Sequence, residues 1–159
     1  MSAGRRSERS LFLADDEEAT LALGHRLARI VGPGLYVALS GHLGSGKTTL
    51  ARGMLRGLGY QGKVKSPTYT LVELYNLSRL DLYHFDFYRF NDSSEWEDAG
   101  FRDYFAPGNI CLVEWPERAE ELLPAPDLKI ELSEEDGGRR ARIVADTERG
   151  TICLNLLPD

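Results

Sequence analysis

Helical periodicities and short apolar runs alternate along the first third of the chain. Asp15 and Glu18 match the capping-box pattern and predict the start of a helix. Apolar residues then recur at helical spacing as far as Val31, and a Gly-Pro-Gly sequence at residues 32–34 ends the helix. Residues 35–39 form an uninterrupted apolar run, which is typical of a strand buried on both faces of a parallel sheet.

The middle of the chain predicts a second helix followed by strands. The helix ends at Gly59. Residues 70–75 and 80–85 are predicted to be strands, and the short polar turn between them makes the pair antiparallel. Residues 92–105 indicate one or two short helices, and residues 110–114 a further buried strand.

The last third predicts a small antiparallel meander. Residues 128–132, 140–145 and 151–156 are three apolar runs separated by turns that contain glycine. By contrast, residues 1–10 are polar, and we expect them to be flexible. The antiparallel pairs, combined with buried parallel runs, predict a mixed sheet.

Length and charge favour a single soluble domain over residues 1–159. The chain has 159 residues and a mass of 17.8 kDa. Its 19 basic and 25 acidic residues give a net charge of −6, which argues against a free-standing nucleic-acid binder. No apolar stretch approaches the roughly 20 residues that cross a bilayer. Arg5 and Arg6 are not followed by the apolar segment of an export signal, so we expect a cytoplasmic protein without membrane contact.

Cysteine and histidine positions indicate neither a disulfide framework nor a zinc site. Cys111 and Cys153 both lie in apolar runs, and we expect them to be buried strand thiols. His25, His42 and His84 do not have the spacing of metal ligands.

A phosphate-binding motif lies between the first predicted strand and the second helix. Gly41-x-x-x-x-Gly46-Lys47-Thr48 matches the P-loop pattern in the required context. Glycines let the backbone turn so that successive N–H groups surround a phosphate. Lys47 would bind the β and γ phosphate oxygens, and the Thr48 hydroxyl would bind Mg²⁺. The predicted nucleotide-binding residues of this segment are Gly41, His42, Leu43, Gly44, Ser45, Gly46, Lys47, Thr48 and Thr49.

With this motif, the pattern of elements predicts an α/β fold. We expect a P-loop NTPase-like three-layer sandwich with a mixed sheet and the C-terminal meander.

Two acidic residues, Asp86 and Glu114, end predicted strands. In such sheets the ligand lies beyond the carboxyl ends of the strands, so both carboxylates would face the P-loop. We predict that they act with Lys47 in catalysis, one binding Mg²⁺ and the other activating the attacking water. Which acid does which is left open, and either could be an exposed strand-end carboxylate.

Two further segments are candidates for nucleotide or partner contacts. Residues 66–69 (Ser66, Pro67, Thr68, Tyr69) follow the P-loop helix, where a switch loop would sense the γ-phosphate, although an ordinary turn also fits. Trp115 follows Glu114 and could stack on a partner or cover the nucleotide; packing at the edge of the core is the alternative. The aromatic run at residues 83–90 favours core packing over base stacking, because its surroundings are acidic.

These stretches together resemble the TsaE family, the small bacterial P-loop ATPases of tRNA threonylcarbamoyladenosine synthesis. The resemblance covers about residues 14–145, in matching order and spacing. It is carried by residues 43–49 (LGSGKTT), 64–73 (VKSPTYTLVE), 84–89 (HFDFYR) and 112–116 (LVEWP).

The resemblance implies that the chain binds ATP and Mg²⁺ and acts with TsaD and TsaB. Those partners transfer the threonylcarbamoyl group to N6 of the adenosine 3′ of the anticodon, so tRNA would be reached through the complex. ATP hydrolysis, weak without the partners, would reset or regulate that complex.

The resemblance also implies roles for individual residues. Thr48 and Glu114 would bind Mg²⁺ with Asp86 close by, and residues 66–69 and Trp115 would belong to two switches. Glu17 would contact the nucleotide, as would Thr68, and a turn containing Gly138 and Arg139 would approach its base or ribose. His42 stands where the family usually has an acidic residue, which leaves a role for that acid in doubt here.

Two other functions are also compatible with a P-loop. A small-molecule kinase should have an arginine-rich lid, but residues 116–121 after Trp115 are short and mainly acidic. A nucleotide-sensing module without significant hydrolysis is harder to distinguish from an ATPase by sequence. The guanine-reading Asn-Lys-x-Asp string of GTPases does not occur.

Overall fold

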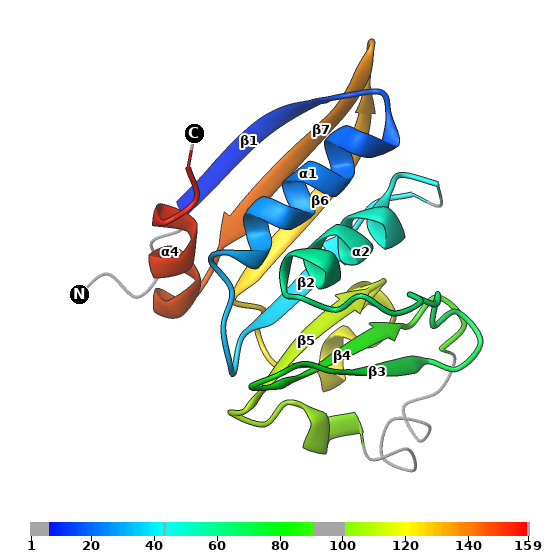
Figure 1. The fold of residues 1–159 in the computed structure, drawn as a ribbon, viewed down its shortest axis with the longest axis vertical. Coiled ribbons are helices and arrows are strands. Elements are labelled where there is room, and N and C mark those ends of the chain that lie inside the picture. The colour runs from blue at the N-terminus through cyan, green and yellow to red at the C-terminus, as the bar shows by residue number, and fades with distance from the viewer. Residues whose placement is uncertain (1–6, 43, 91–100, 159) are drawn as a thin grey trace.

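The chain is built around a mixed sheet that a computed structural model describes over residues 7–42, 44–90 and 101–158 (Figure 1). Within these residues the sheet has seven strands in the order β1-β7-β6-β2-β5-β4-β3. They are β1 (Ser7–Ala14), β2 (Tyr36–Ser40), β3 (Val72–Asn76), β4 (Asp81–Asp86), β5 (Asn109–Glu114), β6 (Leu128–Glu135) and β7 (Gly138–Ala145). The central strands β4, β5, β2 and β6 are parallel, and the outer pairs β3–β4, β6–β7 and β1–β7 are antiparallel.

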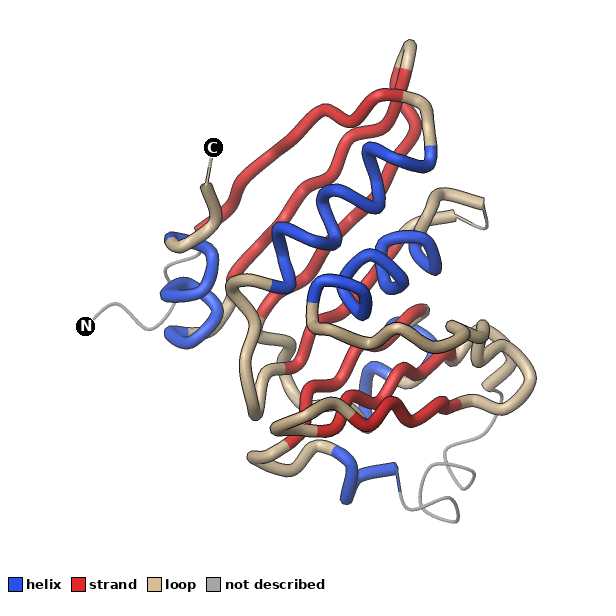
Figure 2. The backbone as a smooth tube through the Cα atoms, in the orientation of Figure 1, coloured by secondary structure: helices blue, strands red, loops and turns tan. Residues whose placement is uncertain are grey.

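Helices α1 (Glu17–Ala28) and α2 (Lys47–Gly57) lie side by side across one face of the sheet (Figure 2). The third helix, α4 (Glu148–Asn155), contacts β1 and β7. Short 3-10 helices η1 (Phe101–Tyr104), η2 (Pro116–Arg118) and η3 (Glu120–Leu122) complete the regular elements of the described residues. None of the helices in these residues has the length and apolar composition needed to span a bilayer.

Side chains that alternate along the buried strands fill two separate cores. In β2, Val37 and Leu39 pack with apolar residues of α1 and α2, whereas Tyr36 and Ala38 join a core on the opposite face. That second core contains Phe85 and Phe87 and is covered by residues of η1, η3 and the adjoining loops. The predicted three-layer α/β arrangement with a mixed sheet is therefore confirmed, and the aromatic run belongs to the core. In the described part of the chain, the third layer consists of the 3-10 helices η1, η2 and η3 and the adjoining loops.

The prediction of a three-stranded C-terminal meander is wrong for its third strand. Residues 151–155 belong to helix α4, and Leu156 is its C-terminal cap. The helix begins after Thr147, whose side chain accepts a hydrogen bond from Gly150 N. Only part of the apolar run is buried, because helical geometry turns Ile152 outward and Leu154 inward. Cys153 is consequently a half-buried helix residue, whereas Cys111 is buried in β5 as predicted.

The third antiparallel partner comes instead from the N-terminus. Residues 7–10 were expected to be flexible, but they form the first half of β1, which pairs with β7 along its whole length. In β1, half-buried residues alternate with exposed ones, so the sequence has few apolar residues that would predict a strand. The backbone hydrogen bonds to β7 hold this edge strand in place. Glu8 also forms an ion pair with Arg142 of β7.

Two local predictions shift by a small number of residues. The residue that caps α1 is Asp16, which accepts a hydrogen bond of 2.7 Å from Ala19 N, and not Asp15. Of the helices predicted at residues 92–105, η1 is observed, and residues 92–100 lie outside the described part of the chain.

Glycines bring the backbones of α1 and α2 into direct contact. A Cβ atom at Gly24 would lie 2.6 Å from Leu50 O, and one at Gly53 would lie 2.5 Å from Leu21 O. Such distances are shorter than any normal Cβ contact, so only glycine fits at both positions. A glycine inside a helix costs about 1 kcal/mol relative to alanine, and here the close helix contact offsets that cost.

We predict that Gly53→Ala destabilises the fold by about 1–3 kcal/mol, because the new methyl group forces α1 and α2 apart. Urea unfolding would measure the change. Gly32→Ala is the matched control, since no atom lies within 4 Å of a Cβ at that position. Equal or greater stability of Gly53→Ala would contradict the proposed helix contact.

Candidate functional site

The P-loop connects the end of β2 to the start of α2. Gly41, Gly44 and Gly46 have positive φ angles of 150°, 80° and 106°. A Cβ at Gly41 would lie 2.5 Å from Ser45 Oγ, whereas a Cβ at Gly44 would meet no atom within 4 Å. The loop is thus packed against the protein at its first glycine and open at Gly44. Leu43, also predicted to contact nucleotide, lies outside the described residues.

A cavity of about 440 Å³ lies in front of this loop. It brings together residues of α1, the P-loop, the ends of β4 and β5, and β7. Of the predicted site residues, those that line it are Glu17, His42, Gly44, Gly46, Lys47, Thr48, Thr49, Thr68, Asp86, Glu114, Trp115 and Arg139. Those that do not line it are Gly41, Ser45, Ser66, Pro67, Tyr69 and Gly138.

Lys47 is held at the bottom of the cavity with only 5% of its surface exposed. Its Nζ donates hydrogen bonds to the carbonyl oxygens of Gly41 and His42, the latter at 3.1 Å. The ammonium also lies 4.2 Å from the centre of the Trp115 ring. Burial lowers the pKa of Lys47, and the nearby carboxylate of Glu114 opposes that shift.

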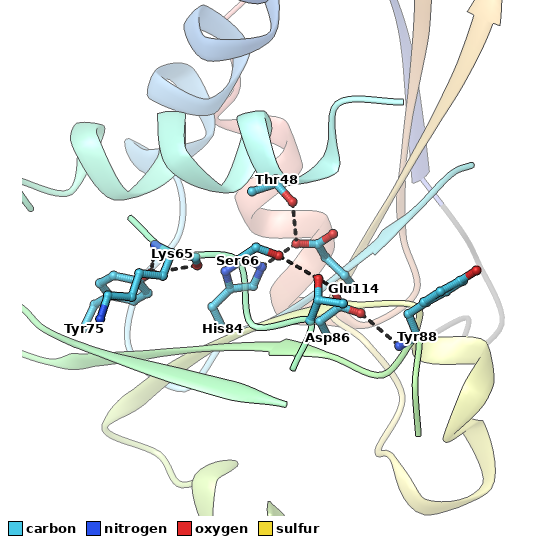
Figure 3. A network of polar contacts seen from close by, with 9 residues as sticks. Thr48, Lys65, Ser66, Tyr75, His84, Asp86, Tyr88 and Glu114 are labelled. Atoms are coloured by element: carbon cyan, nitrogen blue, oxygen red, sulfur yellow. Dashed lines mark hydrogen bonds and ion pairs between the residues drawn. The ribbon is translucent and has the colours of Figure 1, made fainter. Parts of the chain in front are cut away.

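Asp86 and Glu114 lie next to each other because β4 and β5 are parallel and pair them in register. Both carboxyl groups are almost fully buried. Glu114 Oε2 accepts a hydrogen bond of 3.3 Å from Thr48 Oγ1, and Asp86 accepts bonds from Thr68 Oγ1 at 3.1 Å and from Tyr88 N at 2.9 Å (Figure 3). Burial raises the pKa of Asp86, although the Tyr88 N–H opposes this. Neither acid is an exposed strand-end carboxylate.

His84 also belongs to this cluster, which the sequence analysis did not recognise. Its Nε2 lies 2.6 Å from Glu114 Oε2, and its side chain is completely buried. His84 and Asp86 are two residues apart on one strand, so their side chains share a face of the sheet. Because side chains alternate along a strand, the sequence could have indicated that His84 and Asp86 share a face.

Within residues 66–69, Thr68 lines the cavity and Tyr69 lies at the surface. Ser66 Oγ lies 2.8 Å from Thr68 Oγ1, which in turn contacts Asp86. Tyr69 is 81% exposed, and the Arg89 guanidinium lies 4.6 Å from the centre of its ring. The loop therefore joins an acidic residue of the cavity to an exposed aromatic residue.

Trp115 packs at the edge of the second core and also lines the cavity. Its backbone is in the left-handed region, with a φ of 58°, directly after Glu114. The half-buried ring packs against Tyr88 at 4.9 Å and covers the Lys47 ammonium. Packing at the edge of the core and covering the cavity are thus combined in one side chain.

The opposite side of the cavity is formed by α1 and β7. Arg139 is a strand residue of β7 and not part of the turn, which is formed by Asp136 and Gly137. Gly138 does not line the cavity. A Cβ there would run into Leu13 O and the Phe12 ring, so Gly138 packs on β1. The cavity is also lined by Asp15, Asp16 and Thr20, which lie close to Glu17 at the start of α1 and were not predicted as lining residues.

Comparison with known proteins identifies relatives of the whole chain. The family profile described as "Threonylcarbamoyl adenosine biosynthesis protein TsaE" matches residues 14–143. The tRNA threonylcarbamoyladenosine biosynthesis protein TsaE of Haemophilus influenzae is 46% identical over 140 residues, covering 85% of this chain and 89% of the relative. The protein of the same name in Bacillus subtilis is 44% identical over 113 residues, covering 71% and 70%.

A solved structure shares the fold. The crystal structure of Bacillus subtilis YdiB superposes with a TM-score of 0.79 at 30% identity, and covers 99% of this chain and 97% of that one. The profile match and the relatives agree with the resemblance seen in the sequence motifs. The chain belongs to the TsaE family and has a role in the biosynthesis of threonylcarbamoyladenosine in tRNA.

Proposed function

We propose that this chain binds ATP with Mg²⁺ in the P-loop cavity and hydrolyses it in support of tRNA threonylcarbamoylation. One observation carries the proposal: Lys47, Thr48, Asp86 and Glu114 converge on a single cavity from three different elements. This is the set of groups that phosphoryl transfer to water requires, namely a cation, a hydroxyl and two carboxylates.

The P-loop side of the cavity would bind the phosphates. Helix α2 begins at Lys47, so the positive end of its dipole and its first N–H groups point toward the cavity. Lys47 would exchange its hydrogen bonds to backbone carbonyls for bonds to phosphate oxygens. Because the ammonium is already desolvated, that exchange requires little further loss of hydration.

The oxygen ligands around Thr48 fit Mg²⁺. Hydroxyl and carboxylate oxygens are the donors this ion prefers, and it is commonly held by one or two side chains together with phosphates and water. No group of three or more His, Cys, Asp or Glu residues in the described part of the chain is arranged to hold a metal ion. When bound by Thr48, Glu114 and Asp86, Mg²⁺ would neutralise charge that develops on the phosphates.

The two carboxylates would also activate the attacking water. They are adjacent on β4 and β5, and both line the cavity beyond the strand ends. The raised pKa of Asp86 brings its carboxyl group closer to the range in which it can accept and release a proton.

We further propose that the chain acts with TsaD and TsaB and reaches tRNA through them. Tyr69 is exposed at the end of the loop that contacts Asp86, and Trp115 lies over Lys47. A partner that binds these aromatic residues would therefore be coupled to the occupancy of the cavity. The net charge of −6 agrees with tRNA being held by the partners.

The lining of the cavity favours hydrolysis over a small-molecule kinase reaction. Among the described residues that line it, the cations are Lys47 and Arg139, which come from the P-loop helix and β7. These do not form an arginine-rich lid. A nucleotide-sensing module is distinguished by measuring hydrolysis with and without TsaD and TsaB.

We predict that Lys47→Ala weakens binding of Mg-ATP by about 10- to 100-fold, because charged hydrogen bonds to the phosphates are lost. Isothermal calorimetry would measure the affinity, and tRNA modification in cells depleted of the wild-type protein should fail in parallel. Lys63→Ala, an exposed lysine outside the cavity, is the control. Full modification by Lys47→Ala would refute the ATP requirement.

Glu114→Ala should leave the affinity for ATP within a few-fold of wild type but reduce turnover by about 100-fold or more, as expected for loss of a general base or metal ligand. Phosphate release under saturating Mg-ATP tests this. Glu121→Ala removes an exposed acid of η3 and should hydrolyse ATP normally. If Glu114→Ala also hydrolyses normally, Glu114 has no part in the reaction.

Trp115→Ala should bind ATP within a few-fold of wild type and bind the TsaD–TsaB pair at least about 10-fold more weakly, as expected when an aromatic anchor is removed from an interface. A binding titration with the purified partners measures this. Trp115→Phe keeps an aromatic ring over Lys47 and should recover most of the affinity. An unchanged titration for Trp115→Ala would remove this residue from the interface.

A further inference from the structure

His84 makes a short contact with the carboxylate that the proposed reaction depends on. It lies in β4, two residues before Asp86, on the sheet face that carries α1 and α2. Its side chain is 0% exposed, and His84 Nε2 is 2.6 Å from Glu114 Oε2 (Figure 3). A fully buried imidazole at this distance restricts the position of the Glu114 side chain.

The other ring nitrogen indicates which tautomer makes this contact. His84 Nδ1 is buried and has no hydrogen-bond partner within the described residues. A proton on Nδ1 would be a buried donor without an acceptor, which is unfavourable. The geometry therefore places a proton on Nε2, where it is donated to Glu114.

This hydrogen bond makes the two oxygens of Glu114 different. Oε2 accepts from Thr48 Oγ1 and lies within hydrogen-bond distance of His84 Nε2, and these are the hydrogen bonds of the Glu114 side chain within the described residues. Because Glu114 lines the cavity, its second oxygen, Oε1, is left for a ligand.

We propose that His84 is a positioning residue that holds Glu114 by Oε2, so that Oε1 faces the nucleotide site. The inference rests on the ATPase function proposed above. His84 touches neither nucleotide nor water in this role and acts only through the orientation of the carboxylate. Mutation of a residue that orients a metal ligand typically lowers metal affinity or enzyme activity by about 10- to 100-fold.

Two amide substitutions separate this role from a general contribution to packing. The glutamine amide nitrogen can occupy the place of His84 Nε2 and donate to Glu114, whereas the shorter asparagine places its amide nearer the position of Nδ1. Both put a polar amide into the same buried position. Leu82→Ala is the control for lost stability, since Leu82 is fully buried two residues earlier on the same strand and has no polar group.

The full-length variants would be compared by calorimetry with Mg-ATP and by ATP turnover with TsaD and TsaB present. We expect His84→Asn to lose about 10- to 100-fold in kcat while its ATP affinity stays within a few-fold. His84→Gln should recover most of that loss. Leu82→Ala should be less stable than wild type but keep its kcat. Equal kcat in wild type and His84→Asn, or equal losses in the Asn and Gln variants, would overturn the inference.

A measurement on the wild-type protein tests the contact independently of turnover and of whether the variants fold. The ¹⁵N spectrum of the histidine rings at neutral pH should show His84 protonated on Nε2, with a shift that changes in Glu114→Ala. An Nε2 without a proton overturns the positioning role. Absence of ATP hydrolysis by the wild-type protein with its partners would instead overturn the proposed function, while this spectrum still decides the His84–Glu114 contact.

Discussion

The parallel pairing of β4, β5 and β2 is the constraint from which the site follows. Parallel strands end at a common edge, and their register fixes which terminal residues are neighbours. Here the register pairs Asp86 with Glu114 and Glu114 with Leu39, two residues before the P-loop begins at Gly41. The pairing of the strands thereby brings together Asp86, Glu114 and the P-loop, which are far apart in the sequence.

The sequence predicted most of what depends on local pattern. The P-loop, the buried strands and the strand-end acids each have a signature in a few consecutive residues, and Lys47, Thr48, Asp86 and Glu114 all line the cavity. The errors arose where order comes from distant segments. An edge strand such as β1 is stabilised by its ladder with β7, and residues 151–155 form a helix because Thr147 caps it and only one side is buried. Neither effect leaves a clear apolar pattern.

The residues missed at the site illustrate the same limit. His84 was considered only as a metal ligand, and its partner Glu114 is thirty positions away. Asp15 was interpreted as a helix cap, but Asp16 performs that role and Asp15 lines the cavity instead. A residue type indicates what a side chain can do, whereas its neighbours in the fold decide which of those roles it takes.

The glycine contact between α1 and α2 has a mechanical consequence. Both helices begin at the cavity, α1 with Glu17 and α2 with Lys47, and their backbones touch at Gly24 and Gly53 with no side chain between them. Helices whose backbones are in direct contact cannot easily slide or roll past one another, so α1 and α2 form a rigid pair beside the cavity. If the chain binds nucleotide as proposed, a rearrangement on a change of nucleotide would be taken up on the other side of the cavity, by the segments that carry Thr68 and Trp115.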